Sequence, residues 1–322
     1  MTNNYDLVVV DTDTPLFSAA AVSQQRAILV THEPTGIQKR FKTRTEFKEL
    51  MKSKNKPITE AYSIQDLQEP EPVENALHLV KSSMQKIIDM YPSSKVVFVA
   101  GDSNNFRLDL PLPTRYKSQR VNMLRPVHLK ACHKYARQRF GAISADGYEA
   151  DDLTAIIAYD AIEAGNTALL LSVDKDAAQF TGLTLSDHAG SYYKYVSEMH
   201  DVSLVNGKFK SYGIPWIAMQ WTVGDVTDCF KPTELSKSRY GAISAYKDFK
   251  DLKTPQDVLL KVIELYKQFY PKKFEYTDWK GQQHEADWKS MLMLYFQCCK
   301  MKESYDDDLC AGKFLAKYGV DL

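Results

Sequence analysis

The sequence predicts an α/β fold, with a central, mostly parallel sheet flanked by helices and a helical part at the C-terminal end. Three short apolar runs are typical of buried strands: Leu7–Val10, "KVVFVAG" from Lys95 and "TALLL" from Thr167. Segments with helical spacing of apolar residues separate these runs. Strand, helix and strand in this order indicate a parallel sheet with crossover connections.

The elements between the strands follow from local patterns. The stretch from Ile28 to Thr45 predicts a β-hairpin, because a β-rich run is followed by a Pro-Thr-Gly turn and alternating Phe and Thr residues. Apolar positions from Val73 to Ile88 recur with helical spacing and predict a helix. A further helix is expected to begin near Glu149 and to end at Gly165.

The character of the chain changes after Cys229. Residues 254–270 and 285–302 have the pattern of amphipathic helices, and no strand is expected between them. We therefore expect two parts: an α/β domain over residues 1–230 and a helical C-terminal region over residues 231–322.

Composition limits the class of protein. The 322 residues are 44% hydrophobic, which is enough for a substantial core, and no stretch approaches the ~20 apolar residues of a membrane helix. The N-terminus lacks the basic segment of a signal peptide. The five cysteines form no CxxC motif, so neither a disulfide framework nor a zinc site is expected. We expect a soluble protein of the reducing cytoplasm, or of the host cytoplasm if the source is viral.

Charge is segregated along the chain although 41 basic residues balance 41 acidic ones. Residues 39–56 carry eight Lys or Arg against two Glu, and no acid lies between Asp109 and Asp146. The basic residues of that acid-free segment are Arg115, Lys117, Arg120, Arg125, Lys130, Lys134, Arg137 and Arg139. Such runs favour binding to a phosphate backbone, and a solvated helix face is the alternative.

Carboxylates follow every predicted strand of the sheet. They are Asp11 and Asp13 after the first strand, Asp102 after the second, Asp174 and Asp176 after the third, Glu149, Asp151 and Asp152 at a helix start, and Asp225 and Asp228 in a Gly-Asp turn. Because the carboxyl ends of parallel strands share one edge of a sheet, we expect these groups to converge. For any single acid, a helix cap is the alternative, and Asp13 is the strongest candidate for that role.

Converging carboxylates require cations, because several would otherwise take up protons. An all-oxygen set without matched His or Cys favours Mg²⁺ or Mn²⁺ over zinc. Glu149 and Asp152 share a helix face, and the acids suffice for two ions.

A phosphatase is one alternative for the opening Asp-x-Asp. Haloacid dehalogenase-like phosphatases begin with Asp-x-Asp-x-Thr, which "DTDT" at residues 11–14 matches. In that chemistry the first aspartate is a covalent nucleophile. That interpretation leaves Asp102 and the acids of "GYEADD" without a role.

Five motifs in order resemble the 5′-nuclease superfamily: VDTDTPLF, GDSNNFRLDLPLPTRYKSQR, GYEADD, SVDKD and GDVTD. This superfamily includes flap endonucleases, the 5′-nuclease domains of bacterial DNA polymerase I and stand-alone phage 5′ to 3′ exonucleases. The Asp-x-Asp opening is most similar to that of the phage exonucleases. The resemblance spans residues 11–228 and implies a PIN-like 5′-nuclease core followed by a helical DNA-binding part.

The resemblance also implies roles for single residues. The first metal ion would be surrounded by Asp11, Asp102, Glu149, Asp151 and Asp152, and the second by Asp174, Asp176, Asp225 and Asp228. Arg107, Lys117 and Arg120 would lie beside the scissile phosphate as catalytic cations. Tyr116 is expected to stack on a frayed base, and Arg115, Arg125, Lys130 and Lys134 to contact nucleic acid.

Two segments depart from the pattern of the superfamily. The stretch from Tyr116 to Gly147 is shorter than the helical arch of many relatives and contains Pro126, which predicts a reduced or open arch. After "GDVTD" only Gly241-Ala242-Ile243 remains of a glycine-rich helix-hairpin-helix. We therefore expect duplex contact at Gly241, whereas a K⁺ site is not supported.

The expected function is a Mg²⁺-dependent 5′ to 3′ exonuclease or flap endonuclease acting in DNA replication or repair. Two Mg²⁺ ions are the expected cofactors, with Mn²⁺ as a substitute, and DNA with 5′ ends, flaps or nicks is the expected substrate. RNA primers in RNA/DNA hybrids, a replication single-strand-binding protein and a polymerase are further candidate partners; a membrane is not. A PIN-type ribonuclease and a DNA-binding structural protein remain alternatives.

Overall fold

The computed structural model describes residues 4–121 and 123–322, which divide into two compact units. The first unit contains the residues up to Asp13 together with Ile87–Met123 and Ala142–Leu322, and the second contains Thr14–Lys86 and Leu124–Gly141. Within these described residues no helix has both the length and the apolar character needed to cross a membrane.

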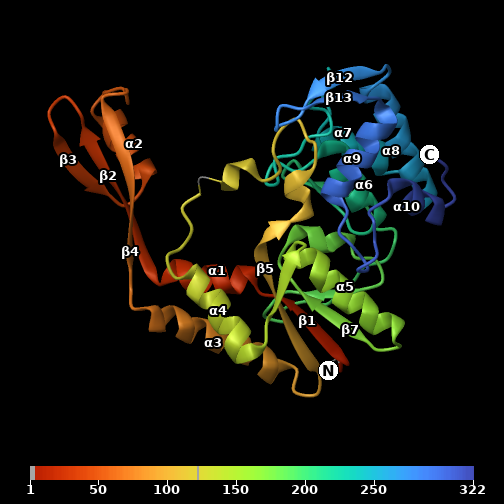
Figure 1. The fold of residues 1–322 in the computed structure, drawn as a ribbon, viewed down its shortest axis with the longest axis horizontal. Helices are drawn as coiled ribbons and strands as arrows, with labels where there is room; N and C mark the ends of the chain where they lie inside the picture. Colours follow the sequence, from red (N-terminus) through yellow and green to blue (C-terminus); the bar gives the residue numbers. More distant parts are fainter. Residues whose placement is uncertain (1–3, 122) are drawn as a thin grey trace. The chain divides into compact units, whose positions relative to one another are not determined.

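The first unit is built on a six-stranded sheet with the strand order β6-β5-β1-β7-β8-β9 (Figure 1). The strands are β1 (Leu7–Asp11), β5 (Lys95–Asn105), β6 (Ile143–Gly147), β7 (Ala168–Leu171), β8 (Thr184–Ser186) and β9 (Lys194–Tyr195). All neighbouring pairs are parallel except β8 and β9. The predicted α/β fold with a mostly parallel central sheet is confirmed.

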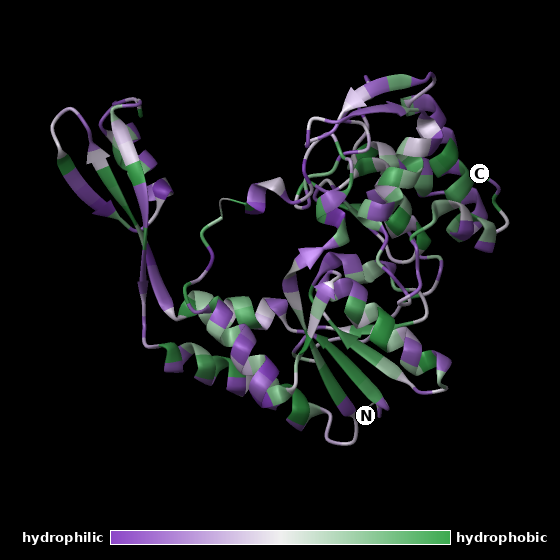
Figure 2. Ribbon diagram, in the orientation of Figure 1, coloured by the Kyte–Doolittle hydropathy of each residue, from purple (hydrophilic) through white to green (hydrophobic). Residues whose placement is uncertain are grey.

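Burial explains why the central strands are continuous apolar runs. Every residue of β1 and β7 is buried, as expected for parallel strands covered on both faces, and Figure 2 shows these strands as hydrophobic. Helix α5 (Ala150–Glu163) packs on this sheet, with Leu153 in the same cluster as Val9 and Leu170. The predicted helix after Glu149 is confirmed.

The remainder of the first unit is mainly helical. Its helices are α6 (Ile214–Val223), α7 (Ala242–Phe249), α8 (Pro255–Phe269), α9 (Trp288–Cys299) and α10 (Ala311–Lys317). Trp221 lies at their centre, where its indole N–H donates to the Leu292 carbonyl at 2.8 Å and its carbonyl accepts from the Tyr266 hydroxyl at 2.6 Å.

Short strands β10 (Ser203–Val205) and β11 (Lys208–Lys210) form a separate antiparallel pair. The core of helices α6 to α10 also includes Leu112 and Tyr116, so it contains residues from both sides of residue 230. The expected division into a nuclease part over residues 1–230 and a DNA-binding part over residues 231–322 stays a proposal.

The expectation of no strand between the last predicted helices is wrong. Strands β12 (Phe274–Thr277) and β13 (Gln283–Ala286) form an antiparallel hairpin there. Its turn is held by Asp278, whose carboxylate accepts the backbone N–H groups of Lys280 and Gln282. Helix α9 consequently begins at Trp288, after the Asp287 cap, rather than at residue 285.

The second unit contains a three-stranded antiparallel sheet in the order β3-β2-β4. Its elements are α1 (Asp13–Val22), β2 (Gln24–His32), β3 (Ile37–Phe41), α2 (Arg44–Ser53), β4 (Tyr62–Pro70), α3 (Val73–Met90) and α4 (Leu129–Phe140), of which α1 and α3 extend across the unit boundaries. The predicted hairpin and the predicted helix from Val73 are confirmed. The strand pattern fails after Phe41, because the Thr43 side chain caps α2 and Thr45 is helical.

We predict that Gly224→Ala destabilises the fold. Gly224 has φ of 84°, and an added Cβ would lie 2.3 Å from the Phe230 carbonyl oxygen, a backbone atom. We expect a loss of about 1–3 kcal/mol in the free energy of unfolding, measured by urea denaturation. Gly312→Ala is the matched control, since its Cβ would meet only Cys310 Sγ at 3.8 Å. Equal stability of the two variants would contradict the prediction.

Candidate metal centre

Three carboxylates of the first unit form a tight cluster. Ligand atoms of Asp176, Asp225 and Asp228 all lie within 4.8 Å of one another, and all three side chains are buried. Asp176 lies on the 3₁₀ turn η3 (Lys175–Gln179) after β7, whereas the other two follow α6. The sequence placed these acids in two separate motifs, and the fold brings them together as expected.

A chain of hydrogen bonds connects this cluster to the end of β1. The Ser172 hydroxyl donates to Asp11 Oδ2 at 3.2 Å and accepts the backbone N–H of Asp174 at 3.0 Å. Asp174 Oδ1 in turn accepts the N–H of Asp176 at 2.9 Å. Acids from β1 and from the β7 end therefore lie on one continuous polar edge.

The pKa values reveal uncompensated negative charge. Burial, with the added charge of Asp13, raises the pKa of Asp11 to about 7. Burial and the charge of Asp174 raise the pKa of Asp176 to about 7. Burial, Asp174 and Asp11 raise the pKa of Asp151 well above its usual range. Oxygen donors that repel one another in this way fit hard divalent cations such as Mg²⁺.

Two cations approach the acids from the segment after β5. Lys117 Nζ contacts Glu149 Oε1 and lies 3.6 Å from Asp228 Oδ1, and Arg120 lies 3.3 Å from the same oxygen. Burial disfavours the charged form of Lys117, but Glu149 and Asp228 keep its pKa above the usual value. Lys117 has a left-handed backbone, with φ of 53°, and its N–H donates to the Asp228 carbonyl at 2.8 Å. Lys117 and Arg120 therefore lie at the acid cluster, and their role beside a scissile phosphate stays a prediction.

Tyr116 differs from its expected position. Its side chain is only 1% exposed, and its hydroxyl donates to Asp228 Oδ2 at 3.0 Å. A second contact, 3.3 Å long, joins the hydroxyl to Glu149 Oε2. A ring packed in this way has no open face for a base, so the structure corrects the prediction of stacking, and Tyr116 instead braces the two acids.

Arg107 was expected beside the scissile phosphate and Asp152 as a metal ligand, but in the structure they form an ion pair with each other. Arg107 is fully buried and donates to both carboxylate oxygens of Asp152, at 2.6 and 2.9 Å. The same two oxygens accept the N–H groups of Glu149 and Lys302, at 3.0 and 2.9 Å. All four acceptor positions of the carboxylate are occupied, which leaves none for a metal ion. Burial opposes ionisation, yet Arg107 lowers the pKa of Asp152 below its usual value.

Asp102 and Asp13, the remaining acids after the predicted strands, have side-chain contacts outside the Asp176, Asp225 and Asp228 cluster. Asp102 is exposed, and its Oδ2 accepts the Ser144 hydroxyl at 2.9 Å. The register of β5 with β6 shifts between Gly101 and Asn105, so Asp102 falls in an irregular part of the strand. Asp13 is the first residue of α1, and its Oδ1 accepts the Gly101 N–H at 2.7 Å, a contact with β5 rather than the helix cap expected for it. The structure therefore does not bring Asp102 into the cluster.

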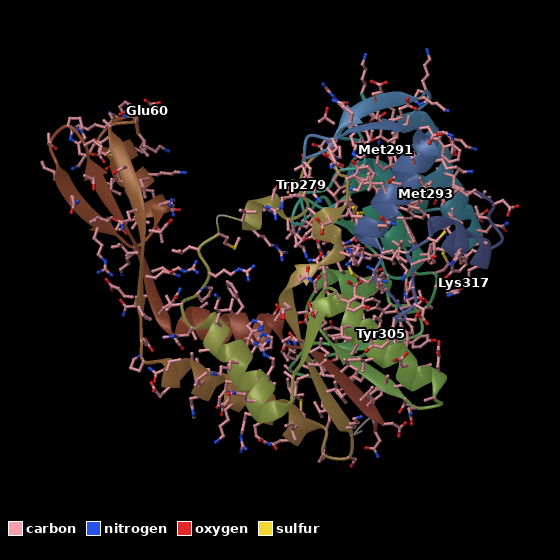
Figure 3. The ribbon with its side chains drawn as sticks, viewed as in Figure 1. Glu60, Trp279, Met291, Met293, Tyr305 and Lys317 are labelled. Atoms are coloured by element: carbon pink, nitrogen blue, oxygen red, sulfur yellow. The ribbon has the colours of Figure 1, made fainter. Side chains whose placement is uncertain are left out.

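The candidate nucleic-acid residues lie in different parts of the chain. Arg115 lies over the ring of Trp279, labelled in Figure 3, at 4.9 Å in the first unit. Arg125, Lys130 and Lys134 are exposed in the second unit, on and before α4. Their contact with nucleic acid stays a prediction.

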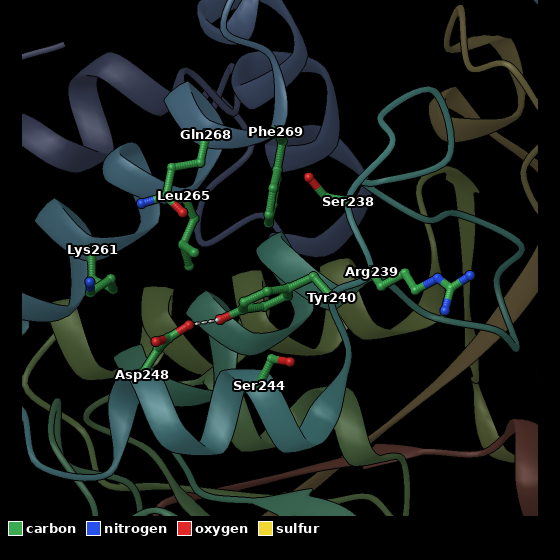
Figure 4. A pocket seen from close by; sticks show the side chains of 9 residues that line it. All are labelled: Ser238, Arg239, Tyr240, Ser244, Asp248, Lys261, Leu265, Gln268 and Phe269. Carbon is green, nitrogen blue, oxygen red and sulfur yellow. Dashed lines mark hydrogen bonds between the residues drawn. The ribbon is translucent and has the colours of Figure 1, made fainter.

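Gly241 immediately precedes α7, and the residue before it, Tyr240, lines a pocket of about 430 Å³ (Figure 4). Tyr240 and Phe269 contribute rings to this pocket, and the Tyr240 hydroxyl donates to Asp248 at 2.8 Å. None of the clustered acids lines it, so it is separate from the metal centre. Duplex contact at Gly241 stays a prediction.

The sequence patterns did not reveal three residues that support the acids. Gln220 donates to Asp176, Lys175 pairs with Asp225, and Ser172 links Asp11 to Asp174. Ser172 and Lys175 lie inside the "SVDKD" motif, so proximity to the acids was an available signal. Gln220 lies 44 residues from Asp176 within an apolar helix, and only the fold places it there.

Part of the sequence matches a known protein family. Residues 58–209 match the family described as 5′-3′ exonuclease, N-terminal resolvase-like domain. The resemblance to the 5′-nuclease superfamily is confirmed. The matched range contains Lys117, Glu149 and Asp176, and it supports a nuclease. No curated protein sequence matches the chain.

Three T5 structures are among the solved structures to which the chain is similar. A T5 protein co-crystallised with metal ions is 16% identical, with a TM-score of 0.46, over 80% of this chain and 78% of that one. The T5 5′-exonuclease with divalent zinc ions bound is 14% identical, with a TM-score of 0.44, over 80% and 89%. A T5 flap endonuclease in a pseudo-enzyme–product complex with DNA and metal ions is 13% identical, with a TM-score of 0.43, over 80% and 88%.

We predict that the metal-free protein loses stability as the pH rises from about 4 to about 7. The pKa of Asp176 is about 7 in the folded protein against an ordinary 3.8, so over this interval the folded state holds a proton that the unfolded state releases. One such proton lowers the free energy of unfolding by up to about 1.4 kcal/mol for each unit by which the pH rises. Urea denaturation in chelator should give a shallower slope for Asp176→Asn than for the unaltered protein. Equal slopes would contradict the raised pKa.

Proposed function

We propose that the protein is a Mg²⁺-dependent, structure-specific 5′ nuclease that hydrolyses DNA phosphodiesters from 5′ ends or at flap junctions. The observation that carries the proposal is the buried cluster of Asp176, Asp225 and Asp228, with Lys117 and Arg120 at its edge. An acid cluster can hold divalent ions, and adjacent cations can bind the phosphate that those ions polarise. Both components are needed for phosphodiester hydrolysis without a covalent nucleophile.

The side chains suggest two groups of metal ligands. Asp11, Glu149 and Asp151 would hold the first ion, and Asp174, Asp176, Asp225 and Asp228 the second. Divalent ions held there would supply Lewis acidity, which lowers the pKa of a water molecule and neutralises charge on a leaving oxygen. Asp152 is proposed here as a positioning residue, since its four hydrogen bonds hold the start of α5 and thereby Glu149 and Asp151.

Lys117 and Arg120 are the proposed phosphate-binding residues. Lys117 pairs with Glu149, and Arg120 pairs with Asp228. These contacts place both cations at the edge of the acid cluster. At that place they would bind a substrate phosphate, where fixed cations stabilise the charge that develops in the transition state.

Further residues are proposed to contact the nucleic-acid substrate away from the cleaved bond. Residues 231–322 are proposed as a degenerate helix-hairpin-helix-like part that contacts duplex, with Gly241 at the start of α7. Arg115, Arg125, Lys130 and Lys134 are proposed as further backbone contacts. Removal of RNA primers during replication, in concert with a polymerase or a single-strand-binding protein, is part of the same proposal.

A phosphatase mechanism is disfavoured by the surroundings of Asp11. This side chain is 4% exposed, and its two oxygens accept hydrogen bonds from the Asp13 N–H and the Ser172 hydroxyl. A covalent nucleophile needs an oxygen free to attack phosphorus. The bonded and buried carboxylate is better suited to holding a cation.

We predict metal-dependent cleavage of substrates with a 5′ end. A 5′-labelled DNA flap, a blunt DNA duplex, an RNA/DNA hybrid and single-stranded RNA should be compared in Mg²⁺, in Mn²⁺ and in chelator. We expect cleavage of the flap and the duplexes with either metal, and none in chelator, because the acids cannot supply a nucleophile themselves. Cleavage of single-stranded RNA alone would favour a PIN-type ribonuclease, and activity that survives chelation would overturn the metal-dependent mechanism.

We predict that Asp176→Ala abolishes cleavage while DNA binding stays measurable. The substitution removes one ligand of the tightest acid cluster, and we expect kcat to fall by at least about 100-fold. Single-turnover cleavage and fluorescence anisotropy with the same flap substrate would measure the two properties. Asp160→Ala, at an exposed position of α5, is the control and should retain full activity. Undiminished turnover of the first variant would remove Asp176 from the site.

A further inference from the structure

Four exposed lysines gather at one end of the second unit. Lys48 and Lys52 lie on α2 one turn apart, about 6 Å along the helix, and Lys54 and Lys56 follow its end. We call these four residues the α2 lysine cluster. Their placement on one short helix and on the three residues that follow it concentrates positive charge in nine consecutive residues, 48–56.

The cluster is held on a folded support. Phe47 and Met51 of α2 are buried against Ile28, Val30 and Phe41 of the small sheet. The Thr43 side chain caps the first turn of α2 by accepting the N–H of Glu46 at 3.1 Å. Because the neighbouring face of the helix is anchored in this way, Lys48 and Lys52 project from a defined surface.

Neighbouring charges divide into two kinds. Arg40 pairs with Glu69 at 2.6 Å, and Arg44 pairs with Asp66 through both of its terminal nitrogens. These two pairs neutralise the arginines closest to the sheet. Within residues 4–121 and 123–322 the structure records no ion pair for any lysine of the α2 cluster. The positive charge of the cluster is therefore available to a partner.

The acids on the same segment do not cancel this charge. Between residues 39 and 56 the only acids are Glu46 and Glu49, and the Glu46 carboxylate accepts the backbone N–H of Lys42 at 2.7 Å. Both glutamates are exposed and keep their negative charge, so four lysines stand against two glutamates on this segment. The net charge is positive, and such a surface complements a polyanion.

We infer that the α2 lysine cluster is a second nucleic-acid contact, which binds the phosphate backbone independently of base sequence. Lysine ammonium groups are compact point charges that suit phosphate oxygens, and no aromatic side chain lies among these four residues to read or stack on a base. The cluster and the acid centre belong to different compact units. The inference therefore concerns binding and holds whether or not the acid centre cleaves DNA.

The test compares the unaltered protein with a variant in which Lys48, Lys52, Lys54 and Lys56 are all alanine. Fluorescence anisotropy with a labelled 20-base-pair DNA duplex and a matched RNA/DNA hybrid, in chelator to prevent cleavage, would give the dissociation constant between 50 and 200 mM salt. The salt slope is the slope of the logarithm of the binding constant against the logarithm of the salt concentration, and each lost phosphate contact lowers its magnitude by about 0.9. We therefore expect the magnitude of the slope to decrease by about 2–4 in the fourfold alanine variant. Its affinity at 100 mM salt should fall by at least about tenfold. Both duplexes should be affected, since they share the backbone charge.

Two controls separate charge from structure. Lysine to arginine at the same four positions should preserve binding, and alanine at the exposed Lys81, Lys86, Lys208 and Lys210 should change it by less than about twofold. If the fourfold alanine variant fails to fold, Lys54→Ala with Lys56→Ala, outside the helix, should lower the slope by about 2. The inference would be overturned if a folded variant kept its affinity and salt slope, or if only one of the two duplexes were affected. It would also be overturned if alanine at the four control lysines caused an equal loss of affinity.

Discussion

The structure depends on the accumulation of buried carboxylates at one edge of a parallel sheet. The pKa values of Asp11 and Asp176 are both raised to about 7, so the folded chain holds more negative groups at this edge than it can ionise by itself. Charge of the opposite sign is therefore required. Lys117, Arg120 and Lys175 supply part of it within the chain, and a divalent ion would supply the rest.

A second, complete ion pair stabilises the support of this edge. Arg107 is buried against Asp152 and also donates to the backbone carbonyls of Gln297 and Lys300, at 3.1 and 2.7 Å. The start of α5 is thereby tied to the segment that follows α9. Removing either partner of such a buried pair typically costs about 3–5 kcal/mol, because the other charge is left unpaired. The end of α9 and the segment after it thus hold the start of the acid-bearing helix α5 in place.

Much of the architecture could be predicted from the sequence because its signals are local. The continuous apolar runs of β1 and β7 indicate buried parallel strands, and the acids that follow them had to meet at one edge. Other elements were predicted less well where short-range chemistry overrode the pattern. Asp278 closes a turn that creates the β12–β13 hairpin, and Thr43 converts an apparent strand into the start of α2.

The sequence by itself determined the fold class, the identity of the acids and their order, because strand pattern and residue type are properties of the chain. Only the tertiary structure decided how each side chain is used, since hydrogen bonds between distant residues depend on three-dimensional placement. Asp152 and Asp176 have the same chemistry, yet Arg107 and two backbone N–H groups saturate the first, whereas the second faces Asp225 and Asp228. Tyr116 was expected to be open to a base, but packing buried its ring and turned its hydroxyl toward Glu149 and Asp228.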